Sequence, residues 1–196
     1  MGKITTLFVE TIASSLFLIP PIFSLHRSRN WEPRKTISYI LFSLYLAAVY
    51  DAAGLPNILY ISFDPRCNLT PFLYMFSDYQ SSVLNVLLFF PLGLSLPLLW
   101  KSFRNARYTL LLGFSASLLI EFLQIFTHRA TDINDLLTNT AGTILGYWSA
   151  KCILGLFPTA AQDNPQKELP VIAAAVFVVM FFLQVFVSDF IWKYLL

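Results

Sequence analysis

The chain has 196 residues, of which 57% are hydrophobic and only 12% are charged, and its formal net charge is +2. A soluble domain carries about 25% charged residues, so this composition excludes an ordinary water-exposed globular protein and predicts a membrane protein. The aromatic share of 16% suits an exterior that faces lipid. No feature of the chain supports binding to nucleic acid.

Six apolar segments are long enough to cross the hydrocarbon core of a bilayer, which takes about 20 residues of helix. They cover residues 4–25, 36–62, 81–100, 108–128, 136–157 and 170–192. Unpaired backbone groups are costly in lipid, and no strand-like alternation runs over roughly ten residues, so we predict helices throughout. The expected fold class is therefore all-α, a polytopic transmembrane helix bundle of about six spans.

Prolines predict where two of these helices bend or stop, because proline removes a backbone N–H and clashes with the preceding turn. The Pro20-Pro21 pair should kink or end the first helix before Phe23. Pro91 and Pro97 should do the same in the third helix.

The second segment is longer than one span needs and passes Gly54 and Pro56. Its helix should therefore end near Ala53, and residues 55–61 should form an interfacial approach.

The basic residues divide unevenly between the two sides of such a bundle. Nine lie in or beside the first, third and fifth loops: Arg27, Arg29, Arg34, Lys35, Lys101, Arg104, Arg107, Lys151 and Lys167. Four lie on the other side: Lys3, Arg66, Arg129 and Lys193. Because basic loops stay in the cytoplasm, we predict that both termini lie outside. Cys67 and Cys152 then fall on opposite sides, so they could not pair.

Glu121 is the residue with the highest free-energy cost of insertion into a bilayer, because it is a carboxylic acid deep in the fourth apolar segment. An ionised carboxylate at a helix centre costs roughly 2.5–3.5 kcal/mol on insertion scales. At helical spacing, Ser117, Glu121, Gln124 and His128 share one face and form a polar stripe that leads to the outer surface. The stripe indicates a functional site. The alternative is a helix–helix contact in which Glu121 is protonated or pairs with a buried arginine.

The short loop after this segment adds more charge. Asp132 or Asn134 is placed to cap the fifth helix, and Asp135 would then lie in its first turn, where the helix dipole favours anions. Capping does not explain Arg129. Its guanidinium could neutralise Glu121, neutralise the aspartates or bind an anionic headgroup.

Amides in the neighbouring segments complete the set. Asn139, Gly142 and Gly146 recur at helical intervals, and a Gly-x-x-x-Gly pattern predicts close packing against another helix. Asn85 lies one turn inside the third segment, where hydrogen bonding to another helix is the simpler interpretation. Asn68 lies in an outer loop of turn-forming residues.

Taken in order, these residues resemble the motifs of the VanZ-like family of membrane proteins. The corresponding residues are Asn68-Leu69-Thr70-Pro71-Phe72, Asn85 with Phe89, Pro91 and Gly93, Ser117 with Glu121 and Gln124, Arg129 with Asp132 and Asp135, and Asn139 with Gly142 and Gly146. The resemblance covers about residues 36–150. It implies a VanZ-like core over residues 36–157. An additional N-terminal helix and basic loop would occupy residues 1–35, and a linker and last helix residues 158–196.

The resemblance also implies an envelope function, since the founding member is an accessory factor for resistance to teicoplanin, a lipoglycopeptide. The first hypothesis is a non-enzymatic protein that binds a lipid-linked precursor or lipoglycopeptide at the outer leaflet. Its recognition groups would be Asn68, Asn85, Glu121, Gln124, Arg129, Asp132, Asp135 and Asn139.

The second hypothesis is a membrane-embedded enzyme that acts on a lipid-linked substrate. Glu121 would be the general acid or base, with Arg129, Asp132 and Asp135 as further catalytic candidates. The two aspartates could hold a divalent cation through oxygen ligands. The sequence has no metal-binding spacing such as CxxC, and neither a resident metal nor a cofactor is predicted. Membrane lipids are expected partners in both hypotheses.

Overall fold

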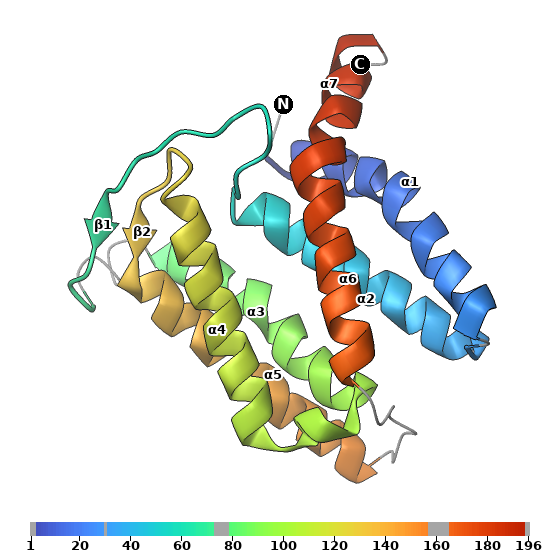
Figure 1. Ribbon diagram of the computed structural model, residues 1–196. Coiled ribbons are helices and arrows are strands. Elements are labelled where there is room, and N and C mark those ends of the chain that lie inside the picture. The colour runs from blue at the N-terminus through green and yellow to red at the C-terminus, as the bar shows by residue number, and fades with distance from the viewer. Residues whose placement is uncertain (1–2, 30, 73–78, 157–164, 195–196) are drawn as a thin grey trace. The chain divides into compact units, whose positions relative to one another are not determined.

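The computed structural model of the chain describes residues 3–29, 31–72, 79–156 and 165–194 (Figure 1). The longer helices are α1 (Lys3–Arg29), α2 (Pro33–Ala52), α3 (Tyr79–Leu99), α4 (Ala106–Gln124) and α5 (Ile133–Leu156). The last helix consists of α6 (Pro165–Val178), a π-helical segment η2 (Val179–Leu183) and α7 (Gln184–Tyr194). The remaining elements are a 3₁₀ turn, η1 (Lys101–Arg104), and two short strands, β1 (Cys67–Asn68) and β2 (Thr131–Asp132).

Helices occupy all six of the predicted apolar segments, so the all-α class is confirmed. Among the described residues, three helices are long and apolar enough to cross a membrane: α3, α4 and the stretch Glu168–Phe190. Six crossings therefore remain a prediction.

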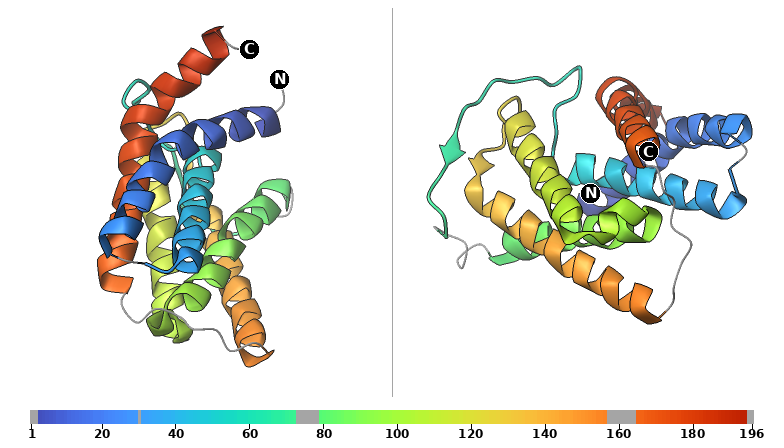
Figure 2. Two further views of the ribbon diagram at one scale, coloured as in Figure 1. Left: turned by 90° about the vertical axis from the view of Figure 1, so that its right-hand side faces the viewer. Right: turned by 60° about the horizontal axis from the view of Figure 1, so that its bottom comes forward.

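The chain divides into two compact units, each described here by itself. Unit 1 comprises Met1–Ile61 and Gln166–Leu196, and unit 2 comprises Ser62–Pro165. Figure 2 gives two further views of the helices in each unit.

Unit 1 packs α1, α2 and the C-terminal helix around buried apolar side chains that include Leu18, Ile22 and Met180. Its core extends to the turn after α2, where the Ile58 N–H donates to the Phe181 carbonyl at 3.0 Å.

A buried ion pair joins α2 to α6 within unit 1. The Lys35 Nζ lies 2.6 Å from Oε1 of Glu168, and the two side chains are 12% and 9% exposed. The Tyr39 hydroxyl donates to the other carboxylate oxygen, Oε2. The Lys35 ammonium also lies 5.0 Å from the centre of the Trp31 ring, where cation–π attraction adds to the pair. We call this set the Lys35–Glu168 pair.

In unit 2, α3 and α5 lie against each other and run in the same direction. A Cβ placed on Gly142 would overlap the Val86 carbonyl, and one on Gly146 would overlap the Phe90 carbonyl. Both positions therefore need glycine so that the two backbones can approach closely. The predicted Gly-x-x-x-Gly packing seam is confirmed.

Of the two outcomes expected at the prolines, a kink or an end of the helix, the end is wrong. Helix α1 continues through Pro20 and Pro21 to Arg29. Helix α3 likewise runs through Pro91 and Pro97. A proline removes one hydrogen bond from a helix, and in lipid a broken helix would expose several more unpaired groups, so continuation is the less costly arrangement.

One of the predicted helix ends agrees with the structure and two others differ from it. As expected, α2 stops at Ala52, and Gly54 follows with a φ of 61°. Helix α4 stops at Gln124, four residues early, and α5 begins at Ile133, three residues early. The predicted segment 158–196 comprised a linker and the last helix; part of the linker lies outside the described residues, and the helix begins at Pro165.

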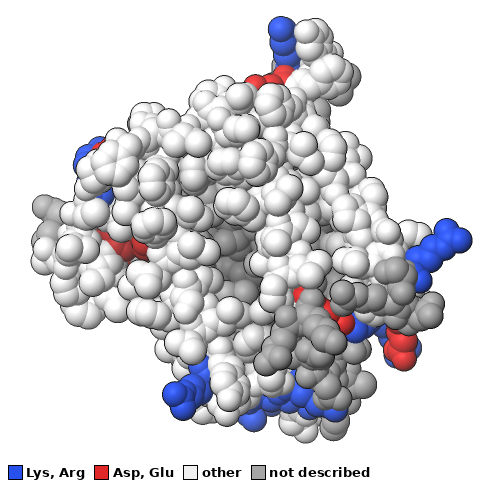
Figure 3. All heavy atoms as spheres, viewed as in Figure 1, with Lys and Arg blue, Asp and Glu red and all other residues white. Residues whose placement is uncertain are grey.

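Charged side chains are sparse on the face seen in Figure 3. Within unit 2, basic side chains gather near η1, which contains Lys101 and Arg104, and an acidic patch lies near β1 and β2 (Figures 1 and 3). The η1 end of the unit is therefore basic, in agreement with the Lys and Arg residues predicted for that loop.

Candidate functional site

A two-stranded parallel ladder brings two loops of unit 2 together at the acidic end. Cys67 lies opposite Thr131, and Asn68 lies opposite Asp132. The ladder is extended by a bond from the Thr131 N–H to the Arg66 carbonyl at 3.0 Å. This pairing could not be predicted from the sequence, because two residues cannot show an alternating pattern.

Glu121 connects the end of α4 to β2 through two hydrogen bonds. Its Oε2 accepts a hydrogen bond from the Asp132 N–H at 2.9 Å. Its main-chain carbonyl accepts one from the Thr131 hydroxyl at 3.0 Å. Glu121 is only 4% exposed, so its side chain faces protein and not lipid.

Asp132 joins three segments through one carboxylate. Its Oδ1 accepts the Asn134 N–H at 2.8 Å, which is the helix-capping bond predicted for α5. Its Oδ2 accepts the Asn68 side-chain amide at 3.1 Å. Asp135 lies in the first turn of α5, also as predicted. We call Asn68, Glu121, Thr131, Asp132 and Asn134 the Glu121–Asp132 cluster.

The cluster also holds a strained residue. The Asn134 side-chain oxygen accepts the Phe72 N–H at 2.7 Å. Phe72 has a φ of 64°, and it is the one non-glycine residue with positive φ among those described. A bulky residue rarely adopts this conformation, and such strain persists where surrounding contacts hold it.

Most of the predicted polar stripe on α4 is buried against protein. Ser117 and Gln124 are buried, and the Ser117 hydroxyl oxygen accepts a hydrogen bond from the Asn139 side-chain amide of α5 at 3.0 Å. His128 does not belong to the stripe, because the helix has already ended and the residue is exposed. The Thr127 hydroxyl donates to the carbonyl of Gln124, the last residue of α4, at 2.9 Å.

The structure also places Asn85 near this level. Val86 lies beside Gly142 in the parallel α3–α5 pair. Asn85 and Asn139 are therefore within about one helical turn of each other along the pair, about 5.4 Å. Asn85 is half-buried, whereas Asn139 is buried.

Buried polar atoms without a hydrogen-bond partner among the described residues occur at this end, and they include Oε1 of Glu121, Oδ1 of Asn139 and Nδ2 of Asn85. Buried polar groups are nearly always hydrogen-bonded, so unpartnered ones mark a strained or functional location. They come from α4, α5 and α3 respectively.

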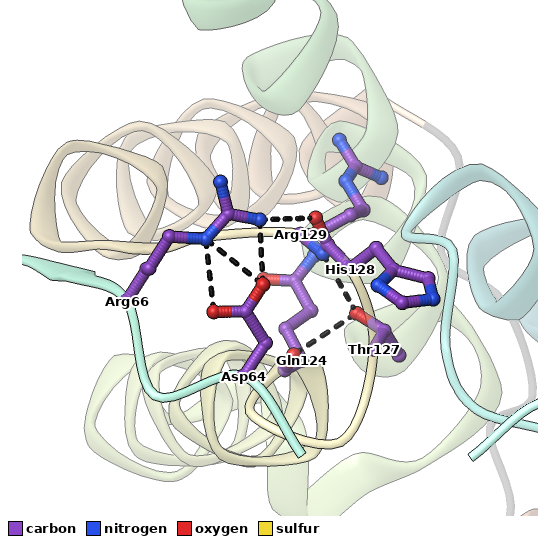
Figure 4. Close-up of polar contacts among 6 residues, drawn as sticks. All are labelled: Asp64, Arg66, Gln124, Thr127, His128 and Arg129. Atoms are coloured by element: carbon purple, nitrogen blue, oxygen red, sulfur yellow. Dashed lines mark hydrogen bonds and ion pairs between the residues drawn. The ribbon is translucent and has the colours of Figure 1, made fainter. Parts of the chain in front are cut away.

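Arg129 is exposed, beyond the end of α4, and its N–H donates to the Thr127 hydroxyl at 3.2 Å. Figure 4 also shows a second pair, Asp64 and Arg66, with which the Arg129 side chain makes none of the drawn contacts. Arg66 Nη2 lies 2.6 Å from Asp64 Oδ2 and donates to the His128 carbonyl at 2.9 Å. The hydrogen bonds that Arg66 donates to the Asp64 carboxylate hold the pKa of Asp64 below its usual value.

The sequence singled out neither Asp64 nor Arg66 as site residues. An acid and a base two residues apart are common in exposed loops, so the pair did not indicate a site. Only the fold shows that Arg66 reaches the loop after α4. No group of three or more His, Cys, Asp or Glu within the described part of the chain could hold a metal ion. Both carboxylate oxygens of Asp132 already accept hydrogen bonds, one from Asn68 and one from Asn134.

Comparison with known proteins identifies one family. The sequence model of the family described as VanZ/LLP1 matches residues 13–155, which is more than half of the chain and reaches into α1. No curated protein and no solved structure matches the chain.

Proposed function

From the premise that this membrane protein belongs to the VanZ-like family, we propose that it is an accessory protein of the cell envelope. It binds the polar part of a lipid-linked precursor or of a lipoglycopeptide at the outer leaflet, in a role of the teicoplanin-resistance type. The binding groups are those of the Glu121–Asp132 cluster with Asn85, Gln124, Arg129, Asp135 and Asn139.

One observation carries the proposal: Oε2 of Glu121 is held by the Asp132 N–H while Oε1 is left without a partner. A carboxylate kept only for packing would be satisfied at both oxygens, since an unmet buried acceptor costs about 1–3 kcal/mol. Intramembrane acids are costly and are usually functional. The fixed orientation of Glu121 supports recognition of a group that donates a hydrogen bond.

The experiment is a paired measurement of membrane abundance and lipoglycopeptide susceptibility for Glu121→Gln and Arg129→Gln. The amide of Glu121→Gln can still accept the Asp132 N–H, so the protein should accumulate normally while its phenotype is lost. Glu32→Gln is the matched control, because Glu32 is exposed and its side chain makes no capping bond. A normal phenotype in both test variants would contradict the proposal.

Topology is tested separately. The proposal puts both termini and the Glu121–Asp132 cluster outside and the η1 turn in the cytoplasm. Cys67 and Cys152 are both exposed and free, so an impermeant thiol reagent on intact cells should label Cys67 and spare Cys152. Cys67→Ser and Cys152→Ser identify which thiol reacts. The opposite pattern would move the site to the cytoplasmic face.

The same orientation of Glu121 also favours a second candidate, a membrane-embedded enzyme with this carboxylate as general acid or base. A catalytic carboxylate needs one oxygen positioned and the other available to a substrate proton. Incubating the reconstituted protein with a lipid-linked substrate separates the two. A converted product whose formation Glu121→Gln abolishes supports the enzyme, whereas unchanged substrate that remains bound supports the accessory role.

A further inference from the structure

The end of α4 carries a second polar feature beside the buried cluster, since the Arg66 carbonyl accepts the Thr131 N–H at 3.0 Å. The loop before β1 lies along this helix end: the Ser62 N–H donates to the Phe126 carbonyl at 3.0 Å, and the Asp64 N–H donates to the Ile125 carbonyl at 2.8 Å. These bonds fix the Asp64–Arg66 pair directly above the last turn of an apolar span.

Aromatic rings connect this loop to the lipid-facing side of α4. Phe122 and Phe126 have ring centres 5.8 Å apart, and Phe126 and Phe63 have centres 6.1 Å apart. Phe122 is 56% exposed and Phe63 is 70% exposed. We call Phe122, Phe126 and Phe63 the aromatic ladder. It leads from the surface of a membrane span to the foot of Arg66.

The guanidinium groups of Arg66 and Arg129 belong to the loops at the Phe63 end of the aromatic ladder. Arg66 donates to the His128 carbonyl, so its guanidinium lies against the residue that precedes Arg129 (Figure 4). The Arg66 side chain is 63% exposed, and its ion pair with Asp64 is therefore a surface pair, which contributes little to stability and exchanges readily. Asp64, Arg66 and Arg129 together carry a net charge of +1.

We propose that this surface binds an anionic phospholipid, with the phosphate on Arg66 and Arg129 and one acyl chain along the aromatic ladder. Arginine suits phosphate because its planar guanidinium offers paired donors to two oxygens. The ladder selects a lipid over free phosphate, because exposed aromatic rings beside a span contact acyl chains and not solutes. Asp64 competes with the phosphate for Arg66.

The inference deepens the proposed function and rests on it, because a lipid held here would present its headgroup beside the Glu121–Asp132 cluster. The two can fail separately. The lipid site is measured by lipid binding and the proposed function by the lipoglycopeptide phenotype. Arg66→Gln enters only the first test and Glu121→Gln only the second, whereas Arg129 belongs to both.

The test uses a fluorescent reporter in the ladder itself. Phe122→Trp is introduced into the full chain and reconstituted in phosphatidylcholine with either dibrominated phosphatidic acid or dibrominated phosphatidylcholine as quencher. Quenching of the introduced indole is taken as the difference from the parent chain, which has four tryptophans of its own. We expect the brominated phosphatidic acid to be preferred at equal mole fraction, by about fivefold for each arginine engaged.

Adding Arg66→Gln or Arg129→Gln should each lower the preference about fivefold. Arg107→Gln, at the other end of α4, should leave it unchanged. Asp64→Asn should raise it, because the competing carboxylate is gone, whereas a merely structural Asp64–Arg66 pair predicts a fall. A preference near one in the Phe122→Trp chain, no effect of either arginine variant, or full competition by inorganic phosphate would overturn the proposal.

Discussion

Among the side chains that the structure describes, each unit of the protein buries one glutamate, and the two glutamates are satisfied in different ways. Glu168 in unit 1 is 8% exposed, and Glu121 in unit 2 is 4% exposed. Both carboxylate oxygens of Glu168 have side-chain partners, the Lys35 ammonium and the Tyr39 hydroxyl. Glu121 has a backbone N–H at one oxygen, and no hydrogen-bond partner among the described residues at the other.

The difference teaches how to separate a structural acid from a functional one when both are buried. A buried ion whose polar atoms all have partners stabilises the fold through those partners. Removing one partner leaves an uncompensated buried charge and lowers the free energy of unfolding. A half-paired carboxylate keeps an oxygen available. Burial alone would have ranked the two glutamates together, and the hydrogen-bond partners distinguish them.

The largest effect is expected where the pairing is complete. Lys35→Met leaves the Glu168 carboxylate buried without its cation, which should lower the free energy of unfolding by about 3–5 kcal/mol. Unfolding in detergent micelles measures this loss. The double variant Lys35→Met with Glu168→Gln should recover most of it, because the amide is neutral and still accepts the Tyr39 hydroxyl. A double variant as unstable as the single one would show that the pair is not the cause.

An intermediate effect is expected at Glu121, and it should depend on the substitution. Glu121→Leu leaves the Asp132 N–H without an acceptor and should cost about 1–3 kcal/mol of stability. Glu121→Gln keeps that bond and should change stability by less than about 0.5 kcal/mol, the usual range for substitutions that break nothing. The same unfolding assay compares them. Equal destabilisation by both would place Glu121 in the structural class with Glu168.

The smallest effect is expected at the strained loop of unit 2. Phe72→Gly keeps the left-handed conformation but removes its steric cost, which is roughly 1–2 kcal/mol for an L-residue. Glycine in turn lowers the stability by roughly 0.5–1 kcal/mol, because it has more conformational freedom in the unfolded chain. The net change should be a slight stabilisation. Leu69→Gly is the control, since Leu69 is exposed like Phe72 and has no positive φ. Destabilisation equal to that of Leu69→Gly would mean that Phe72 carries no strain.

Much of the fold could be predicted from the sequence, because hydropathy and length decide where helices lie in a membrane protein. The Gly142–Gly146 seam and the Asp132 cap followed from local rules. The Lys35–Glu168 pair could not be predicted, since its partners are 133 residues apart and nothing in either segment indicates the other.

The candidate site was predicted as a set of residues, and its connections were not. Glu121, Asp132 and Asn68 were each singled out by cost or by turn chemistry. The bonds that join them pass through backbone groups of two-residue strands, which leave no pattern in a sequence. Arg66 was overlooked for a similar reason, because its contact is with a main-chain carbonyl.

The most direct test of the difference between the two glutamates is one measurement made on both. Lipoglycopeptide susceptibility is determined for cells carrying Glu121→Gln or Glu168→Gln and is divided by the amount of folded protein in the membrane. We predict that Glu121→Gln abolishes the effect per folded molecule, whereas Glu168→Gln lowers only the amount of protein. An unchanged effect per molecule in Glu121→Gln, or equal losses in both variants, would contradict a functional role for Glu121.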